Sequence, residues 1–207
     1  MHSRNILEAG LRIEEAKKAI ILIHGRGGDA RGMVDLKEYL PLKDFAILAP
    51  QATNNTWYPY SFMAPASANE PRLSSAIDTV HGLIDEVTNA GIPAENIYLA
   101  GFSQGACLTL ESAARKAQRY GGIIAFTGGL IGETIDLKNY QGDFSGTPIL
   151  ISSGDPDPHV PVSRVHESEA ILKEMGAQLI VKLYPGRQHT ITSVEVQEAA
   201  TLIATSY

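Results

Sequence analysis

Short apolar runs recur along this chain, and longer stretches with apolar residues three or four positions apart separate them. Most of the short runs are continuous rather than alternating, a pattern typical of strands that helices cover on both faces. On this basis we predict six strands, over residues 19–24, 45–50, 96–100, 122–126, 148–152 and 179–184.

The stretch 71–89 shows helical spacing most clearly. Its apolar residues follow one another in steps of four and three positions, which places them on one face of a helix. They are Leu73, Ile77, Val80, Ile84 and Val87. Gly91 and Pro93 come next and are typical of a helix end. Further helices are predicted over 104–120, 163–175 and 192–203.

Strands and helices alternate from one end of the chain to the other, which predicts a doubly wound, mostly parallel α/β sheet with helices on both faces. No linker, repeat or low-complexity stretch divides the sequence, so we predict a single domain over residues 1–207. The stretch 51–69 is long and unpatterned, which indicates a functional loop. Such sheets place their sites in loops at the carboxyl ends of the strands, so the chemistry is expected there.

Composition narrows the class of protein. The chain has 207 residues, 44% hydrophobic and 19% charged, the balance of a globular protein. A net charge of −6 without blocks of like charge argues against nucleic-acid binding and a polybasic membrane patch. The apolar run 19–23 is too short for membrane insertion, and the first residues are unlike a secretory signal, so we predict a cytoplasmic protein. The oligomeric state stays open, a homodimer included.

One segment combines a motif with the context that its chemistry needs. Residues 101–105 read Gly-Phe-Ser-Gln-Gly, directly between a predicted strand and a predicted helix. Glycines at both flanks allow a sharp turn that leaves the Ser103 hydroxyl exposed, as in the G-x-S-x-G nucleophile elbow. The alternative is a tight turn without chemistry. The strand on one side and the helix on the other favour a nucleophilic serine.

A serine nucleophile needs a histidine base, and that base follows it in the chain. Three histidines come after Ser103. His189 lies between the last predicted strand and the last helix, at the carboxyl edge of the sheet, and is the predicted base. His166 falls within a helical pattern, and His159 is expected to shape the site rather than act as the base.

The orienting acid is expected in the loop after strand 148–152, where Asp155 and Asp157 compete. Prolines fix this loop, so periodicity does not choose between them; the other aspartate would be a turn or capping residue. Two N–H groups must also face the oxyanion. One is expected from Gln104, the residue after the nucleophile, and one from the glycine-rich turn 24–29, which His24 is expected to brace.

The chain resembles the phospholipase/carboxylesterase family of small α/β-hydrolases, which includes acyl-protein thioesterases, and within it a bacterial esterase branch described as dienelactone-hydrolase-like. The likeness covers nearly the whole chain. The motifs that carry it are I-I-L-I-H-G-R-G-G-D, L-A-P-Q-A, W-Y-P-Y, I-Y-L-A-G-F-S-Q-G-A, S-G-D-P-D-P-H-V-P and Y-P-G-R-Q-H-T.

The resemblance implies an α/β-hydrolase fold, a catalytic triad of Ser103, Asp157 and His189, and oxyanion donors at the backbone N–H groups of Arg26 and Gln104. Asp155 then becomes the turn residue. It also implies a serine carboxylesterase that hydrolyses small esters, thioesters or lactones through an acyl-enzyme, with no metal or cofactor. The alternatives are acyl-protein thioesterase or lysophospholipase activity, and a non-catalytic binding protein on a hydrolase scaffold.

The sequence differs from the proteins that it resembles at two positions that bear on the substrate and the nucleophile. The thioesterases usually have a leucine-like residue where Arg26 stands, beside their acyl channel, and a charge there argues against a long lipid substrate. Dienelactone hydrolases use a cysteine in the elbow, where this chain has Ser103. Its only cysteine, Cys107, lies one helical turn later, so we predict a buried structural thiol. A single cysteine excludes an internal disulfide framework and a multi-cysteine metal site.

Three further residues are candidates for the substrate pocket. Trp57 and Tyr58 lie in the long loop after strand 45–50 and are predicted to wall the pocket; the alternative for Trp57 is a plug at the edge of the core. The Arg26 guanidinium is predicted at the rim, where it would pair with a substrate carboxylate. Its alternative is a solvated arginine bonded to a loop carbonyl.

Overall fold

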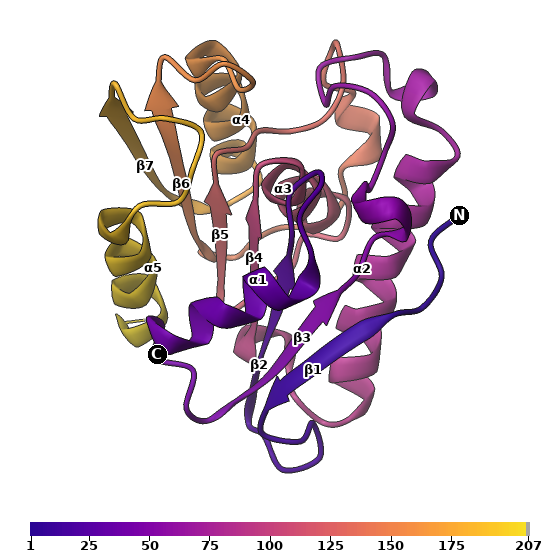
Figure 1. Ribbon diagram of the computed structural model, residues 1–207, viewed down its shortest axis with the longest axis vertical. Coiled ribbons are helices and arrows are strands. Elements are labelled where there is room, and N and C mark those ends of the chain that lie inside the picture. The colour runs from indigo at the N-terminus through magenta and orange to yellow at the C-terminus, as the bar shows by residue number, and fades with distance from the viewer. Residues whose placement is uncertain (206–207) are drawn as a thin grey trace.

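A seven-stranded sheet forms the centre of the molecule, in a computed structural model that describes residues 1–205 (Figure 1). The strand order is β1-β3-β2-β4-β5-β6-β7, and every neighbouring pair is parallel except β1 with β3. The strands are β1 (Ile6–Gly10), β2 (Lys18–Ile23), β3 (Phe45–Pro50), β4 (Ile97–Phe102), β5 (Gly122–Phe126), β6 (Pro148–Asp155) and β7 (Gln178–Pro185).

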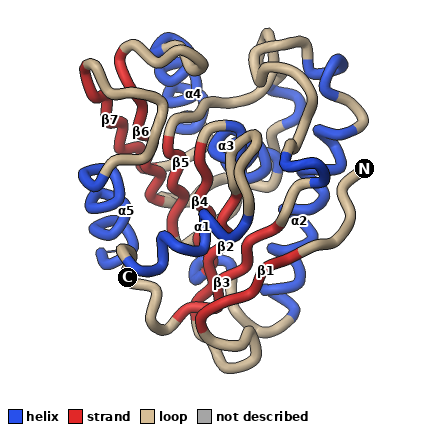
Figure 2. Tube along the Cα trace, in the orientation of Figure 1, coloured by secondary structure: helices blue, strands red, loops and turns tan. Residues whose placement is uncertain are grey.

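Helices cover both faces of this sheet (Figure 2). They are α1 (Ala30–Val34), α2 (Arg72–Asn89), α3 (Gln104–Arg115), α4 (Val162–Glu174) and α5 (Ser193–Thr205). Alternate residues of β2 divide between the two cores: Ile21 and Ile23 pack with α2, α3 and α4, whereas Ile20 and Leu22 pack with α1 and α5. Burial on both faces is the physical reason for the continuous apolar runs in the sequence.

The six predicted strands and the doubly wound sheet are confirmed, with three local differences. β1 was not predicted, because Glu8 interrupts a short apolar stretch at the sheet edge. The five-residue helix α1 is too short to show periodicity. Helix α3 ends at Arg115 rather than at residue 120, because Lys116 leaves the helical conformation and Ala117 bridges to Gly142.

The carboxyl ends of β4, β6 and β7 lie at one edge of the sheet, where their arrowheads point in Figure 1. The strands register so that Phe102 is opposite Phe126 and Asp155 is opposite Pro185. Parallel pairing therefore brings together three loops that are far apart in sequence: the turn at Ser103, the loop after Asp155 and the loop after Pro185.

Candidate active site

Ser103 occupies a strained turn between β4 and α3. Its backbone has φ 53° and ψ −118°, a region that residues with a side chain rarely adopt. The flanking glycines are required by space. A Cβ on Gly101 would lie 2.3 Å from the Gly105 carbonyl oxygen, and one on Gly105 would lie 2.2 Å from the Ile23 oxygen. The sequence context therefore folds as the elbow prediction requires.

Three predicted residues meet at this turn. The Ser103 Oγ lies 2.7 Å from His189 Nε2, and His189 Nδ1 lies 2.9 Å from Asp157 Oδ2. Because Asp157 accepts at Nδ1, the proton of the neutral imidazole sits there, and Nε2 is left to accept from the serine hydroxyl. The Asp157 carboxylate also accepts the backbone N–H groups of His159 at 2.9 Å and Val160 at 3.0 Å.

These contacts hold Asp157 in its charged form. Burial by itself would raise the pKa of this carboxyl, but hydrogen bonds from His189 and from two backbone N–H groups outweigh burial and lower the pKa below its ordinary value. An ionised carboxylate at Nδ1 fixes the imidazole ring and would stabilise an imidazolium.

The other candidates do not share these contacts. Asp155 is exposed at the end of β6, where its backbone carbonyl accepts from Gly186. His166 is exposed on α4 and pairs with Glu169 at 3.1 Å. The His159 ring packs edge-on against His189 with ring centroids 4.7 Å apart, so it borders the site.

A buried polar network holds the loop that carries His189. The Arg187 guanidinium donates to the carbonyls of Gln188 at 2.8 Å and Thr190 at 2.5 Å, and to the Thr127 hydroxyl. Its Nε lies 3.5 Å from Glu195, whose side chain is fully buried. Arg187 and Glu195 were not singled out from the sequence, since a charged residue in a loop, such as Arg187, or in the first turn of a helix, such as Glu195, carries no pattern that marks it as buried.

Glu195 ties this network to the sheet. Its carboxylate accepts from the Ser152 hydroxyl of β6 at 2.6 Å, and from the N–H and hydroxyl of Thr192 at 2.9 and 2.8 Å. These donors satisfy both oxygens of a buried carboxyl group, which would otherwise be costly to bury. The His189 loop is thus fastened at both of its ends.

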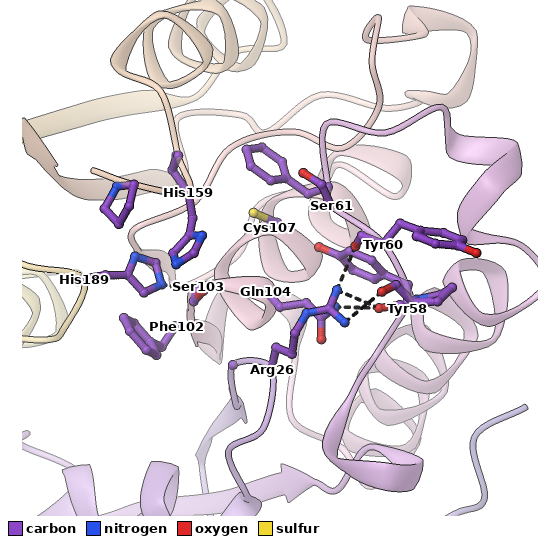
Figure 3. A pocket seen from close by; sticks show the side chains of 15 residues that line it. Arg26, Tyr58, Tyr60, Ser61, Phe102, Ser103, Gln104, Cys107, His159 and His189 are labelled. Carbon is purple, nitrogen blue, oxygen red and sulfur yellow. Dashed lines mark hydrogen bonds between the residues drawn. The ribbon is translucent and has the colours of Figure 1, made fainter. Parts of the chain in front are cut away.

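A cavity of about 490 Å³ opens beside Ser103 (Figure 3). The side chains and backbone that line it are Gly25, Arg26, Tyr58, Pro59, Tyr60, Ser61, Phe62, Phe102, Ser103, Gln104, Cys107, Pro158, His159, Val160 and His189. Residues 58–62 form one continuous side, which we call the pocket wall. Arg26 is the one Lys, Arg, Asp or Glu side chain among the lining residues.

The structure corrects the prediction for Trp57. This side chain is fully buried and does not line the cavity. Its indole Nε1 donates to the His24 carbonyl at 2.8 Å, and its ring packs against His24 with centroids 5.1 Å apart. Trp57 therefore fills the edge of the core, the alternative that its size also suggested. Tyr58 does line the cavity, as predicted.

Arg26 also adopts the alternative arrangement, in which its guanidinium bonds to loop carbonyls. Its guanidinium reaches the rim, but there it donates to three successive carbonyls of the loop, those of Tyr58, Pro59 and Tyr60 (Figure 3). His24 braces the turn below. Its Nδ1 contacts the Gly25 oxygen at 2.7 Å, and its Nε2 accepts from the Ala52 N–H at 3.1 Å.

The two expected oxyanion donors both have backbone N–H groups without a protein acceptor in the part of the chain described. Gln104 is the first residue of α3, where backbone N–H groups have no acceptor within the helix. The positive end of the helix dipole also favours negative charge at this point. Arg26 lies in the neighbouring turn. Both residues border the cavity next to Ser103.

Cys107 lies one turn along α3 and is buried, as predicted, although it also borders the inner part of the cavity. Burial raises the pKa of its thiol to about 12, so it is protonated at neutral pH and is a poor nucleophile. Within residues 1–205, no cluster of three or more His, Cys, Asp or Glu side chains is arranged to hold a metal ion. No helix in the same range is long and apolar enough to span a membrane.

The parallel sheet, the strand–turn–helix at Ser103 and the loops at the carboxyl edge define an α/β-hydrolase fold. The chain belongs to the phospholipase/carboxylesterase family, whose model matches residues 11–207. It is a serine hydrolase of the carboxylesterase and acyl-protein thioesterase type.

Individual relatives agree with this assignment. The crystal structure of a phospholipase/carboxylesterase from Dyadobacter fermentans is 55% identical, with a TM-score of 0.97 over 99% of this chain and 98% of that one. Acyl-protein thioesterase 1 of Kluyveromyces lactis is 28% identical over 94% of both chains. A probable carboxylesterase, SOBER1-like, of Arabidopsis thaliana is 29% identical over 88% of this chain and 76% of its own length.

Proposed function

We propose that this protein hydrolyses small carboxylic esters through an acyl-enzyme on Ser103. The observation that carries the proposal is the unbroken hydrogen-bond chain from Ser103 through His189 to Asp157, at 2.7 and 2.9 Å. These distances are within the reach that a general base needs to take the proton of its nucleophile.

Acylation follows from the arrangement. Ser103 Oγ attacks the carbonyl carbon of the ester while its proton passes to His189 Nε2. The carbonyl oxygen becomes an oxyanion, which the backbone N–H groups of Arg26 and Gln104 stabilise. The tetrahedral intermediate collapses, the bond to the alcohol oxygen breaks, and the imidazolium returns its proton to the leaving alcohol.

Deacylation repeats these steps with water. His189 takes a proton from a water molecule, whose oxygen attacks the acyl carbon of the Ser103 ester. The second intermediate releases the carboxylic acid, and the proton returns to Ser103 Oγ. Asp157 remains ionised throughout and stabilises the imidazolium. A thioester or a lactone would react by the same sequence, with a thiol or the ring's own hydroxyl as the leaving group.

The test uses p-nitrophenyl esters of increasing acyl length together with a fluorophosphonate probe. We expect Ser103→Ala to lower kcat by at least about 10⁴-fold, because the members of a triad act as a unit, and to abolish labelling. Ser112→Ala is the matched control, since it removes a buried hydroxyl from the same helix outside the cavity. Turnover and labelling that survive in Ser103→Ala would overturn the proposal and favour the non-catalytic scaffold.

Thioesterase activity on acylated proteins is a second candidate. The yeast relatives named acyl-protein thioesterase 1 match nearly the whole chain, which favours it. A palmitoyl-peptide thioester and a short-chain ester of equal leaving-group reactivity distinguish the two. Higher kcat/KM on the palmitoyl substrate would make the thioesterase the principal activity.

A further inference from the structure

The turn between β2 and α1 is almost free of side chains. Residues 25, 27 and 28 are glycines, so Arg26 has the only side chain between His24 and Asp29. Gly27 has φ +75°, and glycine backbones have the widest conformational freedom. Backbone hydrogen bonds fix part of the turn, since Gly27 N–H donates to Asn55 at 2.7 Å and Gly28 N–H to Gly25 at 3.1 Å.

The Arg26 side chain ties this turn to the pocket wall. Nη2 donates to the carbonyls of Tyr58 at 2.9 Å and Tyr60 at 2.7 Å, and Nη1 donates to that of Pro59 at 2.9 Å. Backbone N–H groups reach the wall carbonyls of Ser61 and Phe62 only, among the described residues, so those of residues 58–60 depend on side chains or water. One guanidinium thereby orders three consecutive peptide groups (Figure 3).

These bonds leave no fork for a substrate carboxylate. A bidentate carboxylate needs an Nη2 hydrogen together with one from either Nη1 or Nε. Both Nη2 hydrogens of Arg26 are engaged by Tyr58 and Tyr60. Fork binding of a carboxylate would therefore require releasing the wall, which argues that the guanidinium acts on the protein rather than on the substrate.

Gln104 holds the same wall from the other side. Its side-chain Nε2 donates to the Tyr58 carbonyl at 2.8 Å, and its Oε1 accepts the Trp57 N–H at 2.9 Å. The Tyr58 carbonyl thus receives a hydrogen bond from each of two residues. Those residues, Arg26 and Gln104, are the same two whose backbone N–H groups are proposed to bind the oxyanion.

We infer that Arg26 is a positioning residue whose side chain couples the pocket wall to the oxyanion hole. The inference rests on the proposed function. A substrate that fits against the wall leaves the Arg26 N–H in place, whereas one that displaces the wall moves that N–H through the guanidinium. Oxyanion donors must lie about 2.7–3.1 Å from the developing charge. Poorly fitting esters therefore lose turnover as well as affinity.

The test compares Arg26→Met with Arg26→Lys on p-nitrophenyl acetate and octanoate. Arg26→Met keeps a long stem but removes every donor. We expect it to lower kcat on the acetate by about tenfold and to change KM by less than about threefold. Losing an oxyanion donor outright lowers kcat by about 10²–10³-fold, so displacing the donor should cost less. Lysine has three N–H donors for three carbonyls, so Arg26→Lys should recover most of that kcat.

A second expected result concerns substrate discrimination. With the wall released, the ratio of kcat values for acetate over octanoate should shrink in Arg26→Met. Arg31→Met is the matched control, because it removes an exposed arginine five positions away, in α1 and outside the cavity. It should leave both kcat values as in the wild type. Should Arg26→Met not fold, Arg26→Gln, which keeps a single donor group, replaces it.

Three results would overturn the inference. One is unchanged kcat on the neutral esters with a raised KM only for the p-nitrophenyl monoester of succinic acid, which would make Arg26 a ligand of substrate carboxylates. Another is a loss of kcat that Arg26→Lys does not recover and that is proportional to the fall in melting temperature across the variants. The third is equal kcat in all variants while fluorophosphonate still labels Ser103. Absence of that label in the wild type would instead refute the proposed function itself.

Discussion

The two sides of the cavity are held in different ways. Ser103, Asp157 and His189 follow strands of the sheet, and the His189 loop is fastened by Arg187 and Glu195, both buried. The pocket wall lies on the long loop 51–69. Arg26 and Gln104 reach it from other parts of the chain, and Asn69, at the end of the same loop, bonds to Tyr60 and Ser61.

This difference teaches where change is tolerated. Displacing the side that carries the proposed triad means disturbing the sheet or separating the buried pair of Arg187 and Glu195, and both cost several kcal/mol. Tyr58 and Phe62 anchor the wall in the core. Displacing its exposed part, at Pro59 and Tyr60, means replacing hydrogen bonds to partly exposed carbonyls with water, at about 0.5–1.5 kcal/mol each. A chain of this kind can vary its substrate through the wall while the geometry of the reaction stays fixed.

The largest expected effect is on the side of the cavity that carries the proposed triad. Asp157→Asn should lower kcat by about 10⁴-fold, because an amide cannot hold the imidazole in the required tautomer. Asp155→Asn is the matched control in the same loop and should cost less than about threefold, since its side chain is exposed and outside the hydrogen-bond chain. Kinetics on p-nitrophenyl acetate measure both. Equal losses at the two positions would contradict the assignment.

The buried network behind His189 should be next. Arg187→Met leaves the Glu195 carboxylate buried without its cation, which should lower the free energy of unfolding by about 3–5 kcal/mol. Urea denaturation measures this loss. Arg4→Met removes an arginine from an exposed pair with Glu86, where less than about 1 kcal/mol is expected. A small effect at Arg187 would mean that the loop does not depend on the network.

His24, in the turn before α1, should make the stability of the fold depend on pH. Burial lowers the pKa of His24 below 6.5, although its bond to Gly25 opposes the change. The unfolded chain therefore takes up the proton first. Stability is full above the unfolded value of 6.5 and is lost as the pH falls through the lower folded pKa. Denaturation from pH 7.5 to 5 measures this, and His24→Gln should reduce the slope. A wild-type slope of the opposite sign would refute it.

The smallest effect is expected at the wall. The Tyr58 hydroxyl is buried and faces the Cys107 thiol, which is a weak hydrogen-bond partner, and burial raises the pKa of Tyr58 well above 10.0. Removing a hydroxyl whose only partner is a thiol costs little, because the hydrogen bond that is lost is weak. Tyr58→Phe should change the free energy of unfolding by less than about 0.5 kcal/mol. Tyr120→Phe, which loses a bond to the Lys116 carbonyl of 2.9 Å, should destabilise the protein more.

The same comparison explains what could be predicted from the sequence. Buried parallel strands have continuous apolar sequences, so strands β2 to β7 and the sheet could be predicted from the hydrophobic pattern alone. The elbow at Ser103 and the position of His189 followed from strand ends. Asp157 and Asp155 share a proline-fixed loop without periodicity, so their separation depended on resemblance to a family. The prediction for Trp57 was wrong because the sequence pattern around an aromatic loop residue does not show whether its side chain faces a cavity or the core.

The polar networks could not be predicted at all. Whether Arg26 meets a substrate or three carbonyls, and whether Glu195 is buried or solvated, depends on contacts between residues tens of positions apart. Such contacts leave no trace in local hydrophobic spacing. They become visible only when the loops are placed in space.

The edge position of β7 also has a consequence for how the molecule assembles. Ser103 and His189 are 86 positions apart, and β7, the strand before His189, pairs with β6 alone. Contacts of long sequence separation slow folding, because the entropy cost of loop closure comes before the contacts stabilise the chain. On refolding, helical circular dichroism should therefore recover before ester turnover does. The rate at which hydrolysis of a chromogenic ester recovers would then measure how fast the C-terminal quarter of the chain packs onto the rest.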